Sequence, residues 1–323
     1  MKSLARLTLL LLVPAALSCD RNGLQLTTWS AYRNPVLREE VKNPDILAEG
    51  PVWYLYSDGT PTDIIRVLSS TDLVEWGDLD PVFDEDTKPG FIPGGTVSAP
   101  SVLRIADRCL LYYGLAKSPA ESGIGVASAA SPTGPWTDHG ALLTAEATGL
   151  IGLGHPFAFE ADGAPWLAFS AGDGIWLVRL SATGLETASG SEAIRVVEGA
   201  LTEPVFLQEA GAWHLLCTTG DESTGASSTA SITNASAAAL TGPYDNWKNL
   251  LVRSAKFAGP GSPSRPVTDG NGDSWLFYNA YDLSSVSTGR TLMLDRIHWD
   301  GDSAPWIRGN ASSYYTDAPV NTQ

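Results

Sequence analysis

Methionine is scarce in this chain of 323 residues, with 2 copies, and cysteine and histidine are nearly as rare, with 3 and 4. Basic residues are outnumbered, because 36 acids face 20 Lys and Arg and give a net charge of −16. No basic block offsets this charge, so phosphate backbones and anionic membranes would be repelled. We therefore expect no nucleic-acid partner.

Several sequence motifs of catalytic sites are also missing. The chain has no phosphate-cradling glycine loop, no Cys/His metal spacing and no Gly-x-Ser-x-Gly elbow. The sequence therefore predicts neither a cofactor nor a metal. By contrast, 32 Gly, 21 Pro, 11 Trp and 10 Tyr favour strands and turns, and they argue against a helical bundle.

The N-terminus has the three parts of an export signal at residues 1–18. Lys2 and Arg6 are followed by an apolar stretch too short to span a bilayer and by the small-residue site Ala-Leu-Ser. Cys19 comes directly after this site, as in a bacterial lipoprotein whose cysteine is lipidated. An ordinary signal peptidase would also accept the site. The sequence thus predicts an exported protein, either anchored to the membrane through lipid on Cys19 or periplasmic or secreted, with residues 19–33 as a linker.

The two other cysteines lie in apolar runs, as Cys109-Leu-Leu-Tyr-Tyr and His-Leu-Leu-Cys217. Free cysteine behaves as a small hydrophobic residue and is among the most buried residue types. We expect both to be buried free thiols.

An aromatic strand pattern recurs five times, and each copy follows a Gly or Asp turn that suits a hairpin. The copies begin at Trp53, Leu110, Trp166, Trp213 and Trp275. A unit of this length holds four short strands, so the pattern predicts one all-β domain over residues 34–323, a five-bladed β-propeller.

A proline followed by apolar residues precedes each aromatic strand and is expected to mark the start of the blade's first strand. The five copies contain Asn43-Pro, Ala99-Pro, His155-Pro, Glu203-Pro and, more loosely, Arg265-Pro. If the first strands start at one mouth, the residues before these prolines converge on the axis, together with the 262–265 stretch. Polar residues gathered by a repeat are the signal of a functional site.

The sequence resembles glycoside hydrolase family 43, which comprises five-bladed propellers such as arabinanases, β-xylosidases and α-L-arabinofuranosidases. The resemblance runs from about Asn34 to Ile307. It is carried by Asn34-Pro-Val-Leu, Ser98-Ala-Pro-Ser-Val, Ser131-Pro-Thr-Gly-Pro-Trp and Gly289-Arg-Thr-Leu-Met-Leu-Asp-Arg-Ile-His-Trp-Asp-Gly-Asp. It implies inverting hydrolysis by a general base, a general acid and a third carboxyl that tunes the acid. The two working carboxyls stand about 6.5–9.5 Å apart in such enzymes.

Glu203 falls on the acid position of the family, but two other positions depart from its pattern. The base position holds Asn43, and an asparagine cannot take a proton from water. Either the site is silent or Asp45, two residues along the same strand face, serves as a displaced base. The other interpretation of Asp45 is a channel-wall carboxylate bonded to a neighbouring blade. The modulator position holds His155, which is either a partner of Glu203 or a structural histidine.

The last blade of many members carries Pro-Gly-His, whose histidine helps to hold an axial ion, and this chain has Pro-Gly-Ser262. Arg265 adds a positive charge near the mouth. It is a candidate for binding an acidic sugar, for pairing with Glu203 or Asp45, or for a surface ion pair.

Two functions remain open at this stage. The first is an exported glycosidase that acts on arabinose- or xylose-containing polysaccharides, with Glu203 as acid. The second is a carbohydrate-binding propeller that has lost its catalytic carboxyls. Both take a polysaccharide or oligosaccharide as partner, and both predict the same mouth.

Overall fold

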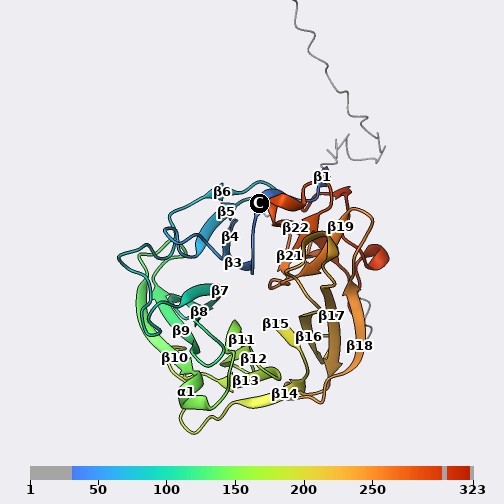
Figure 1. The fold of residues 1–323 in the computed structure, drawn as a ribbon. Helices are drawn as coiled ribbons and strands as arrows, with labels where there is room; N and C mark the ends of the chain where they lie inside the picture. Colours follow the sequence, from blue (N-terminus) through green and yellow to red (C-terminus); the bar gives the residue numbers. More distant parts are fainter. Residues whose placement is uncertain (1–30, 300–303, 321–323) are drawn as a thin grey trace, which may run out of the picture.

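The computed structural model describes residues 31–299 and 304–320, and strands dominate this part of the chain. Five antiparallel sheets stand around one axis as the blades of a ring (Figure 1). In four of them the strands follow one another in chain order from one edge of the blade to the other. The predicted five-bladed β-propeller is confirmed.

Blades I to IV each contain four consecutive strands. Blade I has β3 (Asp45–Glu49), β4 (Val52–Ser57), β5 (Arg66–Ser70) and β6 (Gly77–Asp78). Blade II has β7 (Thr96–Ile105), β8 (Arg108–Ala116), β9 (Ser122–Ala129) and β10 (Thr137–Thr144). Blade III has β11 (Gly154–Ala161), β12 (Ala164–Ala171), β13 (Gly174–Arg179) and β14 (Ile194–Glu198). Blade IV has β15 (Leu201–Glu209), β16 (Ala212–Thr219), β17 (Ser231–Ala237) and β18 (Asp245–Leu251).

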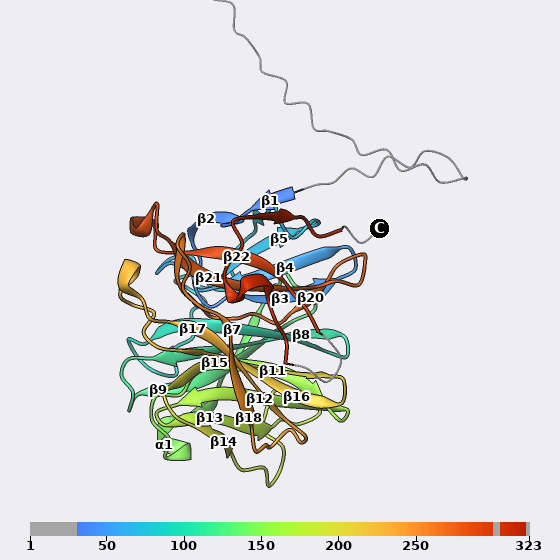
Figure 2. The ribbon, with the colours of Figure 1, turned by 90° about the vertical axis from the view of Figure 1, so that its right-hand side faces the viewer.

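Blade V is built from both ends of the described chain. It contains β19 (Phe257–Gly261), β20 (Val267–Thr268), β21 (Ser274–Asp282), β22 (Arg290–Ile297) and the early strand β2 (Leu37–Glu40), which pairs with β22. Next to it, β1 (Ala31–Arg33) pairs with β23 (Tyr315–Asp317), and Figure 2 shows these segments together at one end of the ring. Strand pairing thus closes the ring, as an edge-free sheet arrangement requires.

Residues 31–33, at the end of the stretch expected to be a linker, form strand β1 and pair with β23. The predicted export signal and Cys19 lie outside the described residues. Within the described part of the chain, no helix has the length and apolar character needed to cross a membrane. The helical pieces there are α1 (Ala145–Thr148), η1 (Gly225–Ser227), η2 (Val286–Thr288) and η3 (Arg308–Asn310).

The five aromatic patterns form the second strands β4, β8, β12, β16 and β21, as predicted. Turns that contain at least one residue with positive φ join them to the preceding strands. In the turn between β11 and β12, Asp162 and Gly163 have φ of 51° and 69°, the left-handed values that match the twist of a two-residue hairpin. The hairpins fix which strand ends meet at the mouth.

In blade I, Pro44 directly precedes β3, as predicted, whereas the prolines of the other blades lie in a different place. In blades II to IV they fall inside β7, β11 and β15, where the pairing register shifts at a bulge. A bulge leaves its extra residue unpaired, so the missing N–H of proline costs the ladder nothing there. In blade V the repeated element is Ser262-Pro263 rather than Arg265-Pro266, and Ser262 follows the same register shift.

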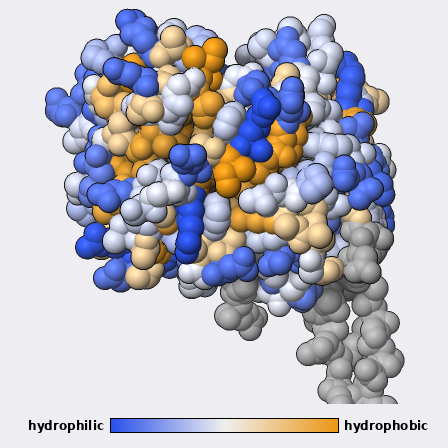
Figure 3. All heavy atoms as spheres, turned by 90° about the horizontal axis from the view of Figure 1, so that it is seen from below, coloured by the Kyte–Doolittle hydropathy of each residue, from blue (hydrophilic) through white to orange (hydrophobic). Residues whose placement is uncertain are grey.

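Aromatic side chains fill the space between blades. Phe159 of blade III stacks on Phe206 of blade IV at 5.4 Å, and Phe83 packs edge-on against Tyr113 of blade II at 5.6 Å. Cys109 and Cys217 are buried and free, as predicted. The outer surface in Figure 3 carries hydrophobic patches among hydrophilic residues, and the aromatic cores behind it hold the blades at fixed positions around the axis.

Candidate active site

The residues before the five repeated prolines meet in one pit at the mouth of the propeller. All five adopt a left-handed backbone conformation that non-glycine residues seldom occupy. They are Asn43 (φ 50°), Ala99 (51°), His155 (48°), Glu203 (57°) and Ser262 (49°). Such strain persists only where the surrounding structure imposes it, so this shared backbone conformation directs five side chains of the ring to one place.

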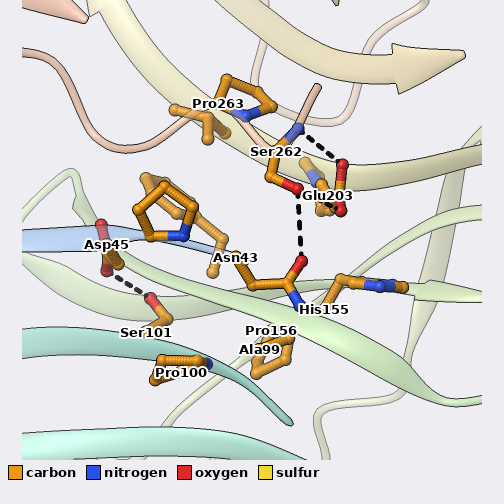
Figure 4. A pocket seen from close by; sticks show the side chains of 14 residues that line it. Asn43, Asp45, Ala99, Pro100, Ser101, His155, Pro156, Glu203, Ser262 and Pro263 are labelled. Atoms are coloured by element: carbon orange, nitrogen blue, oxygen red, sulfur yellow. Dashed lines mark hydrogen bonds between the residues drawn. The ribbon is translucent and has the colours of Figure 1, made fainter. Parts of the chain in front are cut away.

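Glu203 forms the blade IV wall of the pit and is 8% exposed. Its carboxylate accepts hydrogen bonds from the Ser262 hydroxyl at 2.6 Å and the Ser262 backbone N–H at 2.8 Å, as Figure 4 shows. Burial acts to raise the pKa of Glu203, but the charge of His155 and hydrogen bonds from Ser262 and Thr218 outweigh it, so the pKa is lowered. Glu203 is therefore an ionised acceptor unless another group returns a proton to it.

Asn43 forms the opposite wall and is tied to a carboxyl that the sequence analysis did not identify. Its amide N–H donates to Asp58 at 2.8 Å, and its carbonyl accepts from the Ser262 hydroxyl at 3.3 Å. Asp58 also accepts the Ala99 backbone N–H at 2.6 Å. Burial raises the pKa of Asp58 to about 6, against the two hydrogen bonds that lower it. Three short contacts thus link the Asp58 and Glu203 carboxyls across the pit.

Asp45 lies at the edge of the same pit, but its carboxylate faces the neighbouring blade. It accepts the Ser101 hydroxyl at 3.0 Å and the Val102 N–H at 2.9 Å, and Figure 4 shows it pointing away from Glu203. Arg265 approaches the same carboxylate at 3.6 Å. Asp45 is 3% exposed, so its lone pairs are used to join blades.

Arg265 reaches across the axis and does not line the pit. Its guanidinium donates to the backbone carbonyls of Val102 at 3.2 Å and Ala158 at 2.7 Å, in blades II and III. It also lies 4.6 Å from the centre of the Phe157 ring. Of the interactions that the sequence suggested for Arg265, the structure shows the ion pair with Asp45.

His155 lines the pit between blades II and IV. Its Nδ1 atom lies 2.8 Å from the Ser170 hydroxyl, which also contacts the Gly154 carbonyl at 3.2 Å. The imidazole therefore has one ring nitrogen engaged within blade III, and its positive charge, when it is protonated, acts on Glu203.

The residues of the mouth do not suit an axial metal ion. Ser262 stands where the family resemblance implied a histidine, and its hydroxyl and N–H are both committed to Glu203. Within residues 31–299 and 304–320, no group of three His, Cys, Asp or Glu side chains is arranged as a metal site.

A second carboxyl, Glu222, lies beside Glu203 and was also missed. Its Oε1 atom is 2.6 Å from Nη2 of Arg290, whose guanidinium is in turn held by the Asn279 amide oxygen. Burial, followed by the negative charge of Glu203, raises the pKa of Glu222 to about 9 although Arg290 opposes the shift. Glu203 of blade IV therefore has a second carboxyl of the same blade and a guanidinium of blade V in its surroundings.

Both missed carboxyls follow second strands, Asp58 directly after β4 and Glu222 three residues after β16. A second strand runs antiparallel to the first and returns to the mouth, so its last residues belong to the site as much as the residues before proline do. The hairpin pattern in the sequence therefore already indicated that the ends of the second strands lie at the mouth.

The sequence over residues 32–305 matches the family described as glycosyl hydrolases family 43. The match covers most of the chain, and the fold and the pit agree with it. The protein belongs to this family, and it is a glycosidase by that membership.

Among curated proteins, the chain is 27% identical over 283 residues to the extracellular endo-α-(1→5)-L-arabinanase 1 of Bacillus subtilis, covering 81% of this chain and 86% of that one. It is 25% identical over 279 residues to a putative β-xylosidase of Xylanibacter ruminicola, covering 84% of this chain and 49% of that one, about half its length. The family 43 BlXynB structure of Bacillus licheniformis has a TM-score of 0.76 at 20% identity, with 91% of this chain and 60% of that one covered. This last likeness concerns the fold.

Proposed function

We propose that the protein hydrolyses O-glycosidic bonds in arabinose- or xylose-containing polysaccharides by an inverting, single-displacement mechanism. The observation that carries this proposal is the pit itself, in which Glu203 forms one wall and Asn43, whose amide donates to Asp58, forms the other. The relatives named as an arabinanase and a xylosidase support the two sugars. The resemblance to propellers that work with one acid and one base supports the division of roles.

Glu203 is the proposed general acid at the blade IV wall. It protonates the glycosidic oxygen while the bond from that oxygen to the anomeric carbon breaks, and the bonding electrons go to the oxygen. The two Ser262 hydrogen bonds fix the direction of the carboxyl, which is what positioned proton transfer requires.

Asp58 is the proposed general base, acting beside Asn43. Asp45, the other aspartate close to Asn43, does not suit this role, because its carboxylate is bonded to blade II and paired with Arg265. The Asp58 carboxyl is half-buried and touches the side chain at the family's base position. A pKa of about 6 makes it a stronger base than an ordinary aspartate while leaving it ionised at neutral pH. Asn43 orients the attacking water and Asp58 takes its proton.

Product stereochemistry and substrate panels test this function together. Purified protein is incubated with linear arabinan, xylan, their oligosaccharides and aryl glycosides, and proton NMR records the anomeric form of the first product. We expect hydrolysis of at least one arabinosyl or xylosyl substrate, with inversion. Retention would contradict the single displacement. Glycan binding in calorimetry without turnover on any substrate would replace the enzyme by the binding propeller.

We propose further that the protein is exported and anchored through Cys19, as the sequence of residues 1–19 and an extracellular relative support. Radioactive palmitate supplied to bacteria that express the full-length sequence should label the protein, and Cys19→Ala should remove the label. A labelled Cys19→Ala protein, or an unlabelled wild type found in the medium, would contradict the anchor.

A further inference from the structure

Glu222 is held in a fixed position beside Glu203. It lies in the loop between β16 and η1, and the carbonyl of the same residue accepts the Tyr281 hydroxyl at 2.9 Å and an Arg290 N–H at 3.4 Å. Its carboxyl is 2.6 Å from Arg290 Nη2 and its side chain is 26% exposed. Blade V thus anchors both the backbone and the side chain of this residue.

Gly261 lets the Glu222 carboxyl come this close to the site. A Cβ atom at position 261 would lie 2.1 Å from Glu222 Oε1, so a side chain there would displace the carboxyl. The next residue, Ser262, donates two hydrogen bonds to Glu203. The carboxyls of Glu222 and Glu203 therefore lie against two consecutive residues, Gly261 and Ser262, and the charge of Glu203 acts on Glu222 to raise its pKa.

We propose that Glu203 and Glu222 form a carboxyl pair that holds one proton between them, with Glu222 as the positioning residue that supplies Glu203 with the proton it donates. This inference rests on the proposed glycoside hydrolysis and adds to it a residue outside the family's implied trio. Glu222 takes over the task of the third carboxyl, whose position holds His155. When two carboxyls lie side by side, ionising both costs electrostatic free energy, so one of them keeps a proton. A protonated histidine instead favours the ionised form of a neighbouring carboxyl.

The surrounding charges determine which member of the pair carries the proton. The ionised form of Glu203 is stabilised by His155, Arg290 and Ser262, and Asp58 opposes it from across the pit. Glu222 has Arg290 as its cationic partner and faces the negative charges of Glu203 and Asp221. The other titratable groups packed around the pair are Cys217 and Tyr281. In the free enzyme the proton therefore resides on Glu222, and its pKa of about 9 agrees with this placement.

The proposed cycle balances protons. Glu203 gives the shared proton to the leaving oxygen, and the water that attacks the anomeric carbon loses its proton to Asp58. The pair is then doubly ionised. Solvent returns a proton to the pair as Asp58 releases one, so that each turnover consumes one water and leaves the site unchanged.

Carbon NMR of protein labelled at the glutamate side-chain carboxyl tests the pair without any need for turnover. We expect one carboxyl to titrate near pH 9 in the wild type. In Glu222→Gln that high titration should vanish. In Glu203→Gln the remaining Glu222 should titrate about 2 to 3 pH units lower, because the like charge is gone while Arg290 stays. Glu209→Gln, an exposed glutamate on the same blade, is the control and should leave the pair unaltered.

Kinetics supply the second readout. In the wild type, kcat/KM should decline on the alkaline side only as the shared proton is lost, and in Glu222→Gln this limb should move about 2 to 3 pH units toward acid. Thermal unfolding checks that each variant is folded. Separate titration of both carboxyls below about pH 5 would overturn the pair, even in an active enzyme. If the two carboxyls titrate as expected but the protein hydrolyses no substrate, the carboxyl pair is supported and the proposed function is wrong.

Discussion

The two walls of the pit share one backbone design and hold their carboxyls in opposite ways. On the blade IV wall, Glu203 receives two hydrogen bonds from Ser262 and lies next to Glu222 and Arg290. On the blade I wall, the side chain before the proline is the amide of Asn43, and the carboxyl stands behind it on Asp58. The same left-handed backbone conformation thus presents a carboxyl directly on one wall and an amide bonded to a carboxyl on the other.

This difference shows that the repeat fixes where side chains point, and the neighbouring loops fix their protonation. Burial raises the pKa of Asp58 and Glu222, whereas donors and His155 lower that of Glu203 despite its burial. Environments that push carboxyl pKa values apart are what separate an acid from a base at one pH. The site therefore contains carboxyls with different protonation tendencies although the base position holds an amide.

The largest effect is expected at the blade IV wall, from Glu203→Gln. The variant keeps an oxygen to accept from Ser262 but has no proton to give, so kcat should fall by about 10⁴-fold on arabinan or xylan oligosaccharides. Aryl glycosides with a good leaving group should lose less, because they need less protonation. Stopped assays with product chromatography measure the rates, and calorimetry should show that glycan affinity is kept.

A variant that retained turnover within tenfold of the wild type would place the acid elsewhere in the pit. In that case Glu222 becomes the residue to substitute next, since its carboxyl lies beside Glu203. The assignment of the general acid to Glu203 would then be wrong, although the geometry of both walls would be unchanged.

The next largest effect is expected at the blade I wall, from Asp58→Asn, with a loss in kcat of about 10³-fold. In the wild type, kcat/KM should fall as the pH drops through about 6, because the base works only when ionised and burial has raised its pKa to about 6. This acid limb should disappear in the variant. Rates measured between pH 4 and 8 provide the test.

Asp45→Asn is the matched control for the base, since Asp45 is an aspartate of the same blade whose carboxylate bonds blade II. It should preserve the acid limb of the pH profile while lowering the stability of the fold. If Asp45→Asn removed turnover and Asp58→Asn spared it, the base would be the residue first inferred from the sequence.

The sequence predicted the ring and most of the pit because both depend on a repeated pattern. The hairpins, the blade number and the convergence of Asn43, His155 and Glu203 all follow from alternation, turns and the spacing of prolines. Ser262 was placed near the mouth, although the proline assigned to its blade was the wrong one. An error in assigning one copy of the repeat affects that blade alone and leaves the predicted architecture unchanged.

Asp58 and Glu222 could not be predicted in the same way, because they occupy loops that the repeat does not specify. Their chemistry depends on tertiary contacts, namely the Ala99 N–H on Asp58 and Arg290 on Glu222. The role of Asp45 was left open for a similar reason. Its position on the strand was correct, but the partners that saturate its carboxylate come from blades II and V.

The smallest effect is expected from Arg265→Met, which separates support of the pit from contact with its ligand. The substitution leaves the Val102 and Ala158 carbonyls and the buried Asp45 without a cationic partner, so the free energy of unfolding should fall by about 2 kcal/mol. The partial exposure of Arg265 keeps this loss below that of a fully buried pair. Urea unfolding measures it, with the exposed Arg108→Met as the control. The KM for neutral arabinan and for xylan bearing uronic acids should change by the same small factor. A KM raised for the acidic substrate alone, at unaltered stability, would instead make Arg265 a ligand-binding residue, and the axis beneath the two walls would then belong to the binding site.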